Sequence, residues 1–301
     1  MPWQDYYEIV EPAFGRLFNS NAQLQRLWTG CQWAEGPAWF AAGRYLIWSD
    51  IPNNRMLRLD ETDGHVSVFR SPSGNSNGNT VDPLGRLVTA EHGGRRISRT
   101  EFDGTVITIA DRWRGKRLNS PNDVVVNSDG SIWFTDPAYG IESDYEGNKA
   151  ESEIGACNVY RVDPASGDVK AVITDMVRPN GLAFTPDEME LFVADSGRTH
   201  GEENPAHIRR FEVKGDRLGR SSVFADSKAG LFDGFRFDRD GRLWTSTGEG
   251  VECYKRDGTL LGRIKVPEVV ANVTFGGAQR NVLYICGTTS LYAVRLMVNG
   301  A

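Results

Sequence analysis

A sixfold internal repeat constrains the fold of this chain more than any other feature of its sequence. In each copy a polar residue, usually followed by Gly, opens a short apolar run, and a turn with Asp or Gly leads to a second run. Repeats of this kind are typical of solenoids and propellers. The copies are WAEGPAWFAAGRYLIWSD at 33–50, SNGNTVDPLGRLVTAEH at 76–92, PNDVVVNSDGSIWFTDP at 121–137, PNGLAFTPDEMELFVADS at 179–196, FDGFRFDRDGRLWTSTG at 232–248 and VANVTFGGAQRNVLYICG at 270–287.

Each copy is followed by a third apolar run, and the first five copies by a fourth. The alternating apolar residues and turn dipeptides predict antiparallel hairpins, and no helical periodicity stands out after about residue 22. Four strands repeated radially six times predict an all-β fold, a six-bladed β-propeller.

The sixth repeat lacks a fourth run, because the chain ends at Ala301 soon after SLYAVRL. We expect the segment AQLQRLW, residues 22–28, to supply that strand in the last blade, which closes the ring and covers a bare sheet edge. Residues 1–21 are then an N-terminal extension across the outside, and residues 22–301 form a single propeller domain.

The charge pattern excludes some partners. The formal net charge is −6 and the sequence has no dense run of Lys and Arg, so no nucleic-acid partner is expected. No stretch of about 18 apolar residues predicts a membrane span. The N-terminal residues lack the basic start and apolar run of a signal peptide. We therefore expect a cytoplasmic protein, either a monomer or a small homo-oligomer.

The first strand of each repeat should line the central channel, with its leading residue near one mouth. All six leading residues are carboxylates or carboxamides, namely Glu35, Asn77, Asn122, Asn180, Asp233 and Asn272. Asn and Asp are also common in turns, but a scaffold needs no such residue at this position of every repeat. A set of oxygen ligands suits one hard divalent cation, with Ca²⁺ favoured and Mg²⁺, Mn²⁺ or Zn²⁺ as alternatives.

Specific roles follow from this ring. The carboxylates of Glu35 and Asp233 would balance the charge of the cation, and the amide carbonyls of Asn180 and Asn122 would complete the protein ligands. Asn122 and Asn77 are also candidate substrate contacts, because positions left open on the cation would admit substrate.

The second strand of each repeat returns to the same mouth and ends 14 or 15 residues later. Asp195 is a candidate general base, Asp136 a candidate substrate contact, and His92 a candidate for either role, since it could titrate near neutral pH. For each of them a turn or hydrogen-bonding role is the simpler alternative. The six residues at this position are Asp50, His92, Asp136, Asp195, Thr247 and Cys286.

The chain resembles the SMP-30/gluconolactonase family in the motifs WAEGPAW, GRLVTAEHG, LNSPNDVV, RPNGLAF and FDGFRFD, in that order between about residues 22 and 296. The resemblance implies a six-bladed propeller with a divalent metal on Glu35, Asn180 and Asp233. It places Asn122 beside them and implies that Asp233 also carries protons. Animal members have Arg two residues before the Asn of their N-D motif, where this chain has Ser120, so their sugar contacts do not transfer.

These features favour metal-dependent hydrolysis of a sugar lactone, similar to gluconolactone, to the aldonic acid. The cation would polarise the lactone carbonyl, and Asp123 would orient Asn122 or the metal cluster. One alternative is a phosphotriesterase or arylesterase on the same metal. Another is a non-catalytic propeller with a structural metal, because this fold supports many functions. The polar channel mouth favours the sugar lactone.

Overall fold

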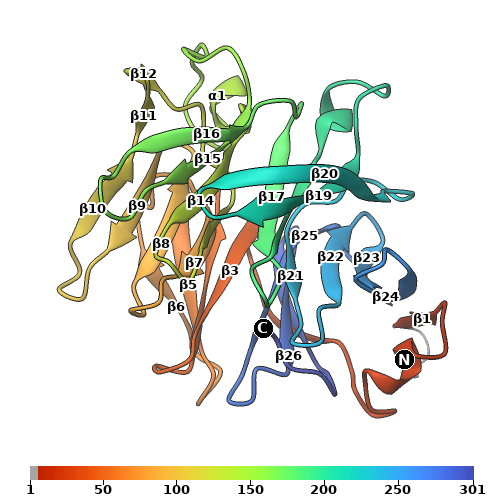
Figure 1. Cartoon of the computed structure of the whole chain (residues 1–301). Coiled ribbons are helices and arrows are strands. Elements are labelled where there is room, and N and C mark those ends of the chain that lie inside the picture. Colours follow the sequence, from red (N-terminus) through yellow and green to blue (C-terminus); the bar gives the residue numbers. More distant parts are fainter. Residues whose placement is uncertain (1–5) are drawn as a thin grey trace.

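Six antiparallel sheets, five with four strands and one with five, surround a central axis in the computed structural model, which describes residues 6–301 (Figure 1). The predicted six-bladed β-propeller is confirmed. Blade one consists of β3(Ala34–Phe40), β4(Tyr45–Asp50), β5(Arg55–Asp60) and β6(Val66–Arg70), and blade two of β7(Ser76–Val81), β8(Leu87–Glu91), β9(Arg96–Thr100) and β10(Val106–Ala110). Blade three consists of β13(Val124–Val126), β14(Ile132–Asp136), β15(Asn158–Val162) and β16(Val169–Ile173), and blade four of β17(Pro179–Phe184), β18(Glu190–Asp195), β19(His207–Lys214) and β20(Arg217–Asp226). Blade five consists of β21(Phe235–Phe237), β22(Leu243–Thr247), β23(Gly250–Tyr254) and β24(Leu260–Lys265), and blade six of β25(Val270–Gly276), β26(Val282–Gly287), β27(Ser290–Arg295) and β2(Gln25–Thr29).

Apolar side chains pack between neighbouring blades rather than in one central core. The inner strands are buried on both faces, whereas the outer strand β6 is largely exposed. Trp48, Trp133 and Trp244 are at most 1% exposed. They pack between blades six and one, three and four, and five and six, respectively. The core therefore leaves the axis free for the polar residues that begin the inner strands.

The N-terminal strand β2 closes the ring as predicted. It pairs antiparallel with β27, from Gln25 opposite Ala293 to Thr29 opposite Ser290, and completes the sixth blade. Before it, β1(Tyr7–Ile9) adds a fifth strand to blade five by pairing with β24 (Figure 1). The short 3-10 helix η2(Phe14–Arg16) then packs Phe14 against Trp244. The division into an extension at 1–21 and a domain at 22–301 stays a prediction, and residues 1–5 lie outside the described residues.

Two long connections leave the second strands of blades three and four. Residues 137–157 join β14 to β15 and contain the one-turn helix α1(Tyr139–Glu142), and residues 196–206 join β18 to β19 and contain the 3-10 helix η3(Gly197–His200). A short hairpin, β11(Arg112–Trp113) and β12(Lys116–Arg117), lies at the same end of the molecule as α1 (Figure 1). Within residues 6–301, no helix has the length and apolar character needed to span a membrane.

Candidate metal centre and active site

Glycines after the leading residues allow the inner strands to approach one another at the axis. A Cβ on Gly36 would lie 2.0 Å from the backbone oxygen of Asn77, and a Cβ on Gly181 would lie 2.0 Å from the backbone oxygen of Asp233. Real Cβ atoms do not approach so closely, so both positions require Gly. The repeated polar-Gly pair thus brings the leading side chains of adjacent blades together.

Hydrogen bonds between blades fix this arrangement. The hydroxyl of Ser49 in blade one donates to the backbone oxygen of Asn77 in blade two at 2.7 Å. The hydroxyl of Thr135 in blade three donates to the backbone oxygen of Asn180 in blade four, also at 2.7 Å. Backbone positions around the mouth are therefore set by neighbouring blades, which makes the site rigid before any ligand arrives.

Glu35 and Asp233 are the two carboxylates of this ring. The buried Glu35 side chain accepts hydrogen bonds at Oε2 from the Gly36 amide at 2.6 Å and from Asn272 Nδ2 at 3.0 Å. Burial nevertheless raises the pKa of Glu35 to about 8. Burial, and then the charge of Glu35, raises the pKa of Asp233 well above its usual value. Two anions that destabilise each other in a poorly solvated place favour a bound cation.

The amide residues complete a ligand set that fits a hard cation. The buried Asn180 Oδ1 has no hydrogen-bond partner among the described residues, while its Nδ2 donates to the Ser196 hydroxyl at 3.1 Å. An orphaned buried acceptor is costly, and a cation would satisfy it. In residues 6–301 no three His, Cys, Asp or Glu side chains form a metal cage by themselves. A metal on Glu35 and Asp233 therefore needs amide oxygens, which Asn180 and Asn122 can supply.

Asp123 lies behind the cluster. Its Oδ1 accepts a hydrogen bond from the Val124 amide at 2.9 Å, and Arg236 Nη1 lies 3.6 Å from its Oδ2. Burial raises the pKa of Asp123, and the Arg236 guanidinium opposes that effect. Because the Asp123 charge also raises the pKa of Glu35 and Asp233, the Asp123 carboxylate adds to the negative field that favours a cation.

His92 and Asn77 meet at the mouth, with 3.1 Å between His92 Nε2 and Asn77 Nδ2. The His92 ring is fully buried, and burial lowers its pKa to about 4, against a raising effect from the Glu146 backbone. The imidazole is therefore neutral at pH 7, and titration near neutral pH is not supported. This geometry favours the orienting role over the acid–base role.

The aspartates at the ends of the second strands form hydrogen bonds with the segments that precede the inner strands. In each case the carboxylate accepts hydrogen bonds from two consecutive amides of the segment that leads into the inner strand of its own blade. Asp136 binds the amides of Asn119 and Ser120, both at 2.9 Å, and Asp195 those of Val177 and Arg178 at 2.9 and 2.8 Å. Asp50 does the same with Gln32 and Trp33. Their oxygens are thus engaged by the backbone, which favours bracing over the predicted substrate and base roles.

The β14–β15 connection brings two further residues to the site that the repeat pattern missed. Glu146 Oε2 lies 3.9 Å from His92 Nδ1, and the Glu146 charge contributes to the raised pKa of both Glu35 and Asp233. The second residue is Tyr139, because burial and also the charge of Asp233 raise the pKa of the Tyr139 hydroxyl. The unusual length of this connection could have indicated a role in the site, because the second strand of each blade ends at the mouth and a loop that follows it begins there.

The two long connections are tied to each other beside the mouth. Glu142 Oε1 accepts hydrogen bonds from Arg178 Nη2 at 2.9 Å and from His200 Nε2 at 2.8 Å. The Tyr139 hydroxyl lies 3.2 Å from the Thr199 hydroxyl. This network fixes the wall of the site contributed by blades three and four.

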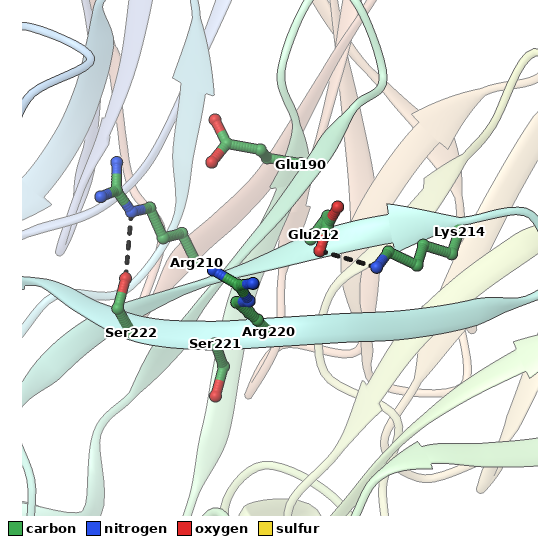
Figure 2. A pocket seen from close by; sticks show the side chains of 7 residues that line it. All are labelled: Glu190, Arg210, Glu212, Lys214, Arg220, Ser221 and Ser222. Carbon is green, nitrogen blue, oxygen red and sulfur yellow. Dashed lines mark hydrogen bonds and ion pairs between the residues drawn. The ribbon is translucent and has the colours of Figure 1, made fainter.

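A hollow over β18, β19 and β20 of blade four differs from the axial site in its charges. Figure 2 shows Lys214 paired with Glu212 and Arg210 bonded to Ser222 there. Its charges of both signs lie on β18, β19 and β20, and none of the axial residues lines it. The hollow therefore offers no counterpart to the convergent oxygen atoms of the axis.

Comparisons with known proteins agree with the geometry. Residues 33–289 match the model of the SMP-30/gluconolactonase/LRE-like region. The gluconolactonase of Zymomonas mobilis is 31% identical, over 96% of this chain and 85% of that protein. The structure of a gluconolactonase from Xanthomonas campestris is similar with a TM-score of 0.91 and 39% identity, covering 97% of this chain and 95% of that one. A calcium-binding regucalcin from Agrobacterium tumefaciens shares the fold, with a TM-score of 0.75, 21% identity, and 93% and 96% coverage.

Proposed function

Because the chain belongs to the SMP-30/gluconolactonase/LRE-like family, we propose that it is a lactonase that hydrolyses a sugar lactone to the aldonic acid at the axial mouth, using one divalent cation. The observation that carries this proposal is the meeting of the buried Glu35 carboxylate and the half-buried Asp233 carboxylate, whose pKa values are both raised, with an orphaned amide oxygen. A propeller that served only as a scaffold would gain nothing from this arrangement.

Glu35, Asp233, Asn180 and Asn122 would hold the cation, with Ca²⁺ favoured because every ligand atom is a hard oxygen. When bound, the cation would polarise the lactone carbonyl and stabilise the negative charge that develops on its oxygen. The resemblance also implies proton transfer by Asp233. Of its two implied roles we propose only cation binding, because a bound cation lowers the basicity of a carboxylate.

Asn77 and His92 would orient the sugar. The neutral His92 ring is held by Asn77 and can exchange hydrogen bonds with a hydroxyl group without gaining charge. Asn122 would bind substrate as well as the cation, because it lies beside the strand of Asn77, where the Gly78 amide donates to the Asn122 backbone oxygen at 2.8 Å. The bracing contacts of Asp136 and Asp195 leave both outside this proposal as substrate contact and base.

A comparison of substrate classes tests this proposal against its alternatives. Protein loaded with Ca²⁺ is assayed with D-glucono-1,5-lactone, phenyl acetate and a paraoxon-type phosphotriester, with spontaneous hydrolysis subtracted. Since buried polar groups penalise substrates that leave them unpaired, kcat/KM for the sugar lactone should exceed that for either alternative by at least ~100-fold. A preference for the phosphotriester or the aryl ester would support the alternative enzyme class, and turnover of none would support a structural metal.

A further inference from the structure

Lactone hydrolysis requires a group that takes a proton from the attacking water. Nearly every carboxylate near the mouth has another task. Asp136 and Asp195 each accept hydrogen bonds from two backbone amides. Asp123 faces Arg236, and Glu142 binds Arg178 and His200. Under the proposed function, Glu35 and Asp233 bind the cation.

Glu146 differs from all of these. Its carboxylate accepts no hydrogen bond from any described residue, and its Oε2 lies 3.9 Å from Nδ1 of His92. The Glu146 side chain is 26% exposed, which places it between the buried cluster and the solvent. A free carboxylate in such a position can contact both the substrate and the water that attacks it.

The connection that carries Glu146 is held in place around it. The Asn148 amide donates to the backbone oxygen of Gly140 at 3.1 Å, and the Ala150 amide donates to that of Ile141 at 2.9 Å. Gly140 packs on His92, because a Cβ there would lie 2.5 Å from His92 Cβ. Glu146 is therefore presented by an anchored turn that rests on the residue beside the axial ring.

We propose that Glu146 is the general base of lactone hydrolysis, a role that rests on the proposed function. The attacking water gives one proton to the Glu146 carboxylate as its oxygen bonds to the carbonyl carbon. The bond from that carbon to the ring oxygen then breaks, and Glu146 returns the proton to the ring oxygen. The product is the hydroxy acid, and the carboxylate is regenerated.

The electrostatic surroundings support this role. Glu142 on the same connection, Glu35 and Asp233 across the mouth, and neutral His92 are the titratable groups that face Glu146. Burial, and then the charge of Glu142, raises the pKa of Glu146. A carboxylate with a raised pKa is a stronger base than an ordinary one.

Two variants and a control test the proposal on the full chain loaded with Ca²⁺. In Glu146→Gln the kcat for D-glucono-1,5-lactone should fall by at least ~100-fold, while Ca²⁺ affinity measured by calorimetry stays within about twofold, since the account gives Glu146 no ligand role. Formate should restore part of the activity of Glu146→Ala and none to the wild type. Glu151→Gln, on the same connection and exposed, should behave as the wild type.

Three results would overturn the role of Glu146. These are a wild-type kcat in Glu146→Gln, a Glu146→Ala variant that formate leaves unchanged, or a loss of Ca²⁺ affinity that parallels the loss of activity, which would make Glu146 a ligand. Failure of the proposed function has a separate signature, because the wild-type protein would then hydrolyse no lactone with any cation.

Discussion

Asn272 Nδ2 donates a hydrogen bond to Glu35 Oε2 at 3.0 Å, although 237 residues separate them in the chain. The bond joins the inner strand of the last blade to that of the first at the channel axis. It also holds the Glu35 carboxylate where burial raises its pKa to about 8. Ring closure and the electrostatics of the site are therefore linked.

The metal-free protein should lose stability as pH rises. The ordinary pKa of Glu35 is 4.5 and its folded value about 8, so between these values the folded state holds a proton that the unfolded state has released. Stability then decreases across this window and levels off above it. Glu35→Gln should flatten the curve and melt a few degrees higher at pH 8 in EDTA. If the melting temperatures of the two proteins changed with pH in the same way, the Glu35 carboxylate would not be the cause of the pH dependence.

Asn180 should matter for the cation through its oxygen. Asn180→Ala removes the orphaned Oδ1, and we expect Ca²⁺ affinity to fall at least ~10-fold, since one such polar contact contributes about 1–3 kcal/mol. Asn180→Asp keeps an oxygen and adds charge, so it should bind at least as tightly as the wild type. Calorimetric titration measures both. Asn281→Ala, at an amide bonded only within blade six, is the control, and equal affinities in all four proteins would exclude Asn180 as a ligand.

Gly181 should be as important as the ligands it positions. In Gly181→Ala the new Cβ would meet the Asp233 backbone oxygen at 2.0 Å, so blades four and five must separate at the axis. We expect a lower melting temperature and weaker Ca²⁺ binding, because Asp233 moves with its backbone. Gly15→Ala meets Ile9 Cδ1 at an ordinary 3.4 Å and should change neither. Unchanged Ca²⁺ affinity in Gly181→Ala would mean that this close packing does not set the site.

The closing strand should be required for a stable ring. Removal of residues 1–29 deletes β2 and leaves β27 with an unpaired edge, which favours aggregation. Size-exclusion chromatography should show aggregates, whereas removal of residues 1–5 should leave a well-behaved protein. A stable, well-behaved protein from the longer deletion would show that five complete blades and a three-stranded sixth are sufficient.

The sequence predicted the features that recur in every repeat. The six blades and the polar leading residues follow from a position read six times, so an ambiguous copy such as Asn272 was resolved by the others. The closing strand follows from the fourth run that the first five repeats have and the sixth lacks. The polar-Gly pair was visible too, although its reason, the close approach at Gly36 and Gly181, became clear only from the structure.

The direction of individual side chains and the structure of the long connections could not be predicted from the repeats. A strand-end aspartate such as Asp195 can face the channel or the amides of the preceding loop, and only backbone geometry decides between them. Glu146 has no counterpart in the other repeats, because it lies in a connection that blade three alone has in this form. Its contact with His92 joins two blades, and no local pattern encodes such a contact.

The most direct test of the central claim is the rate of D-glucono-1,5-lactone hydrolysis by metal-stripped protein before and after Ca²⁺, Mg²⁺, Mn²⁺ or Zn²⁺ is restored, with Asp233→Ala in parallel and the spontaneous rate subtracted. Stripped protein should be inactive, at least one cation should restore hydrolysis, and Asp233→Ala should stay inactive with every cation. Equal rates with and without cations, from folded protein that binds them, would contradict the central claim.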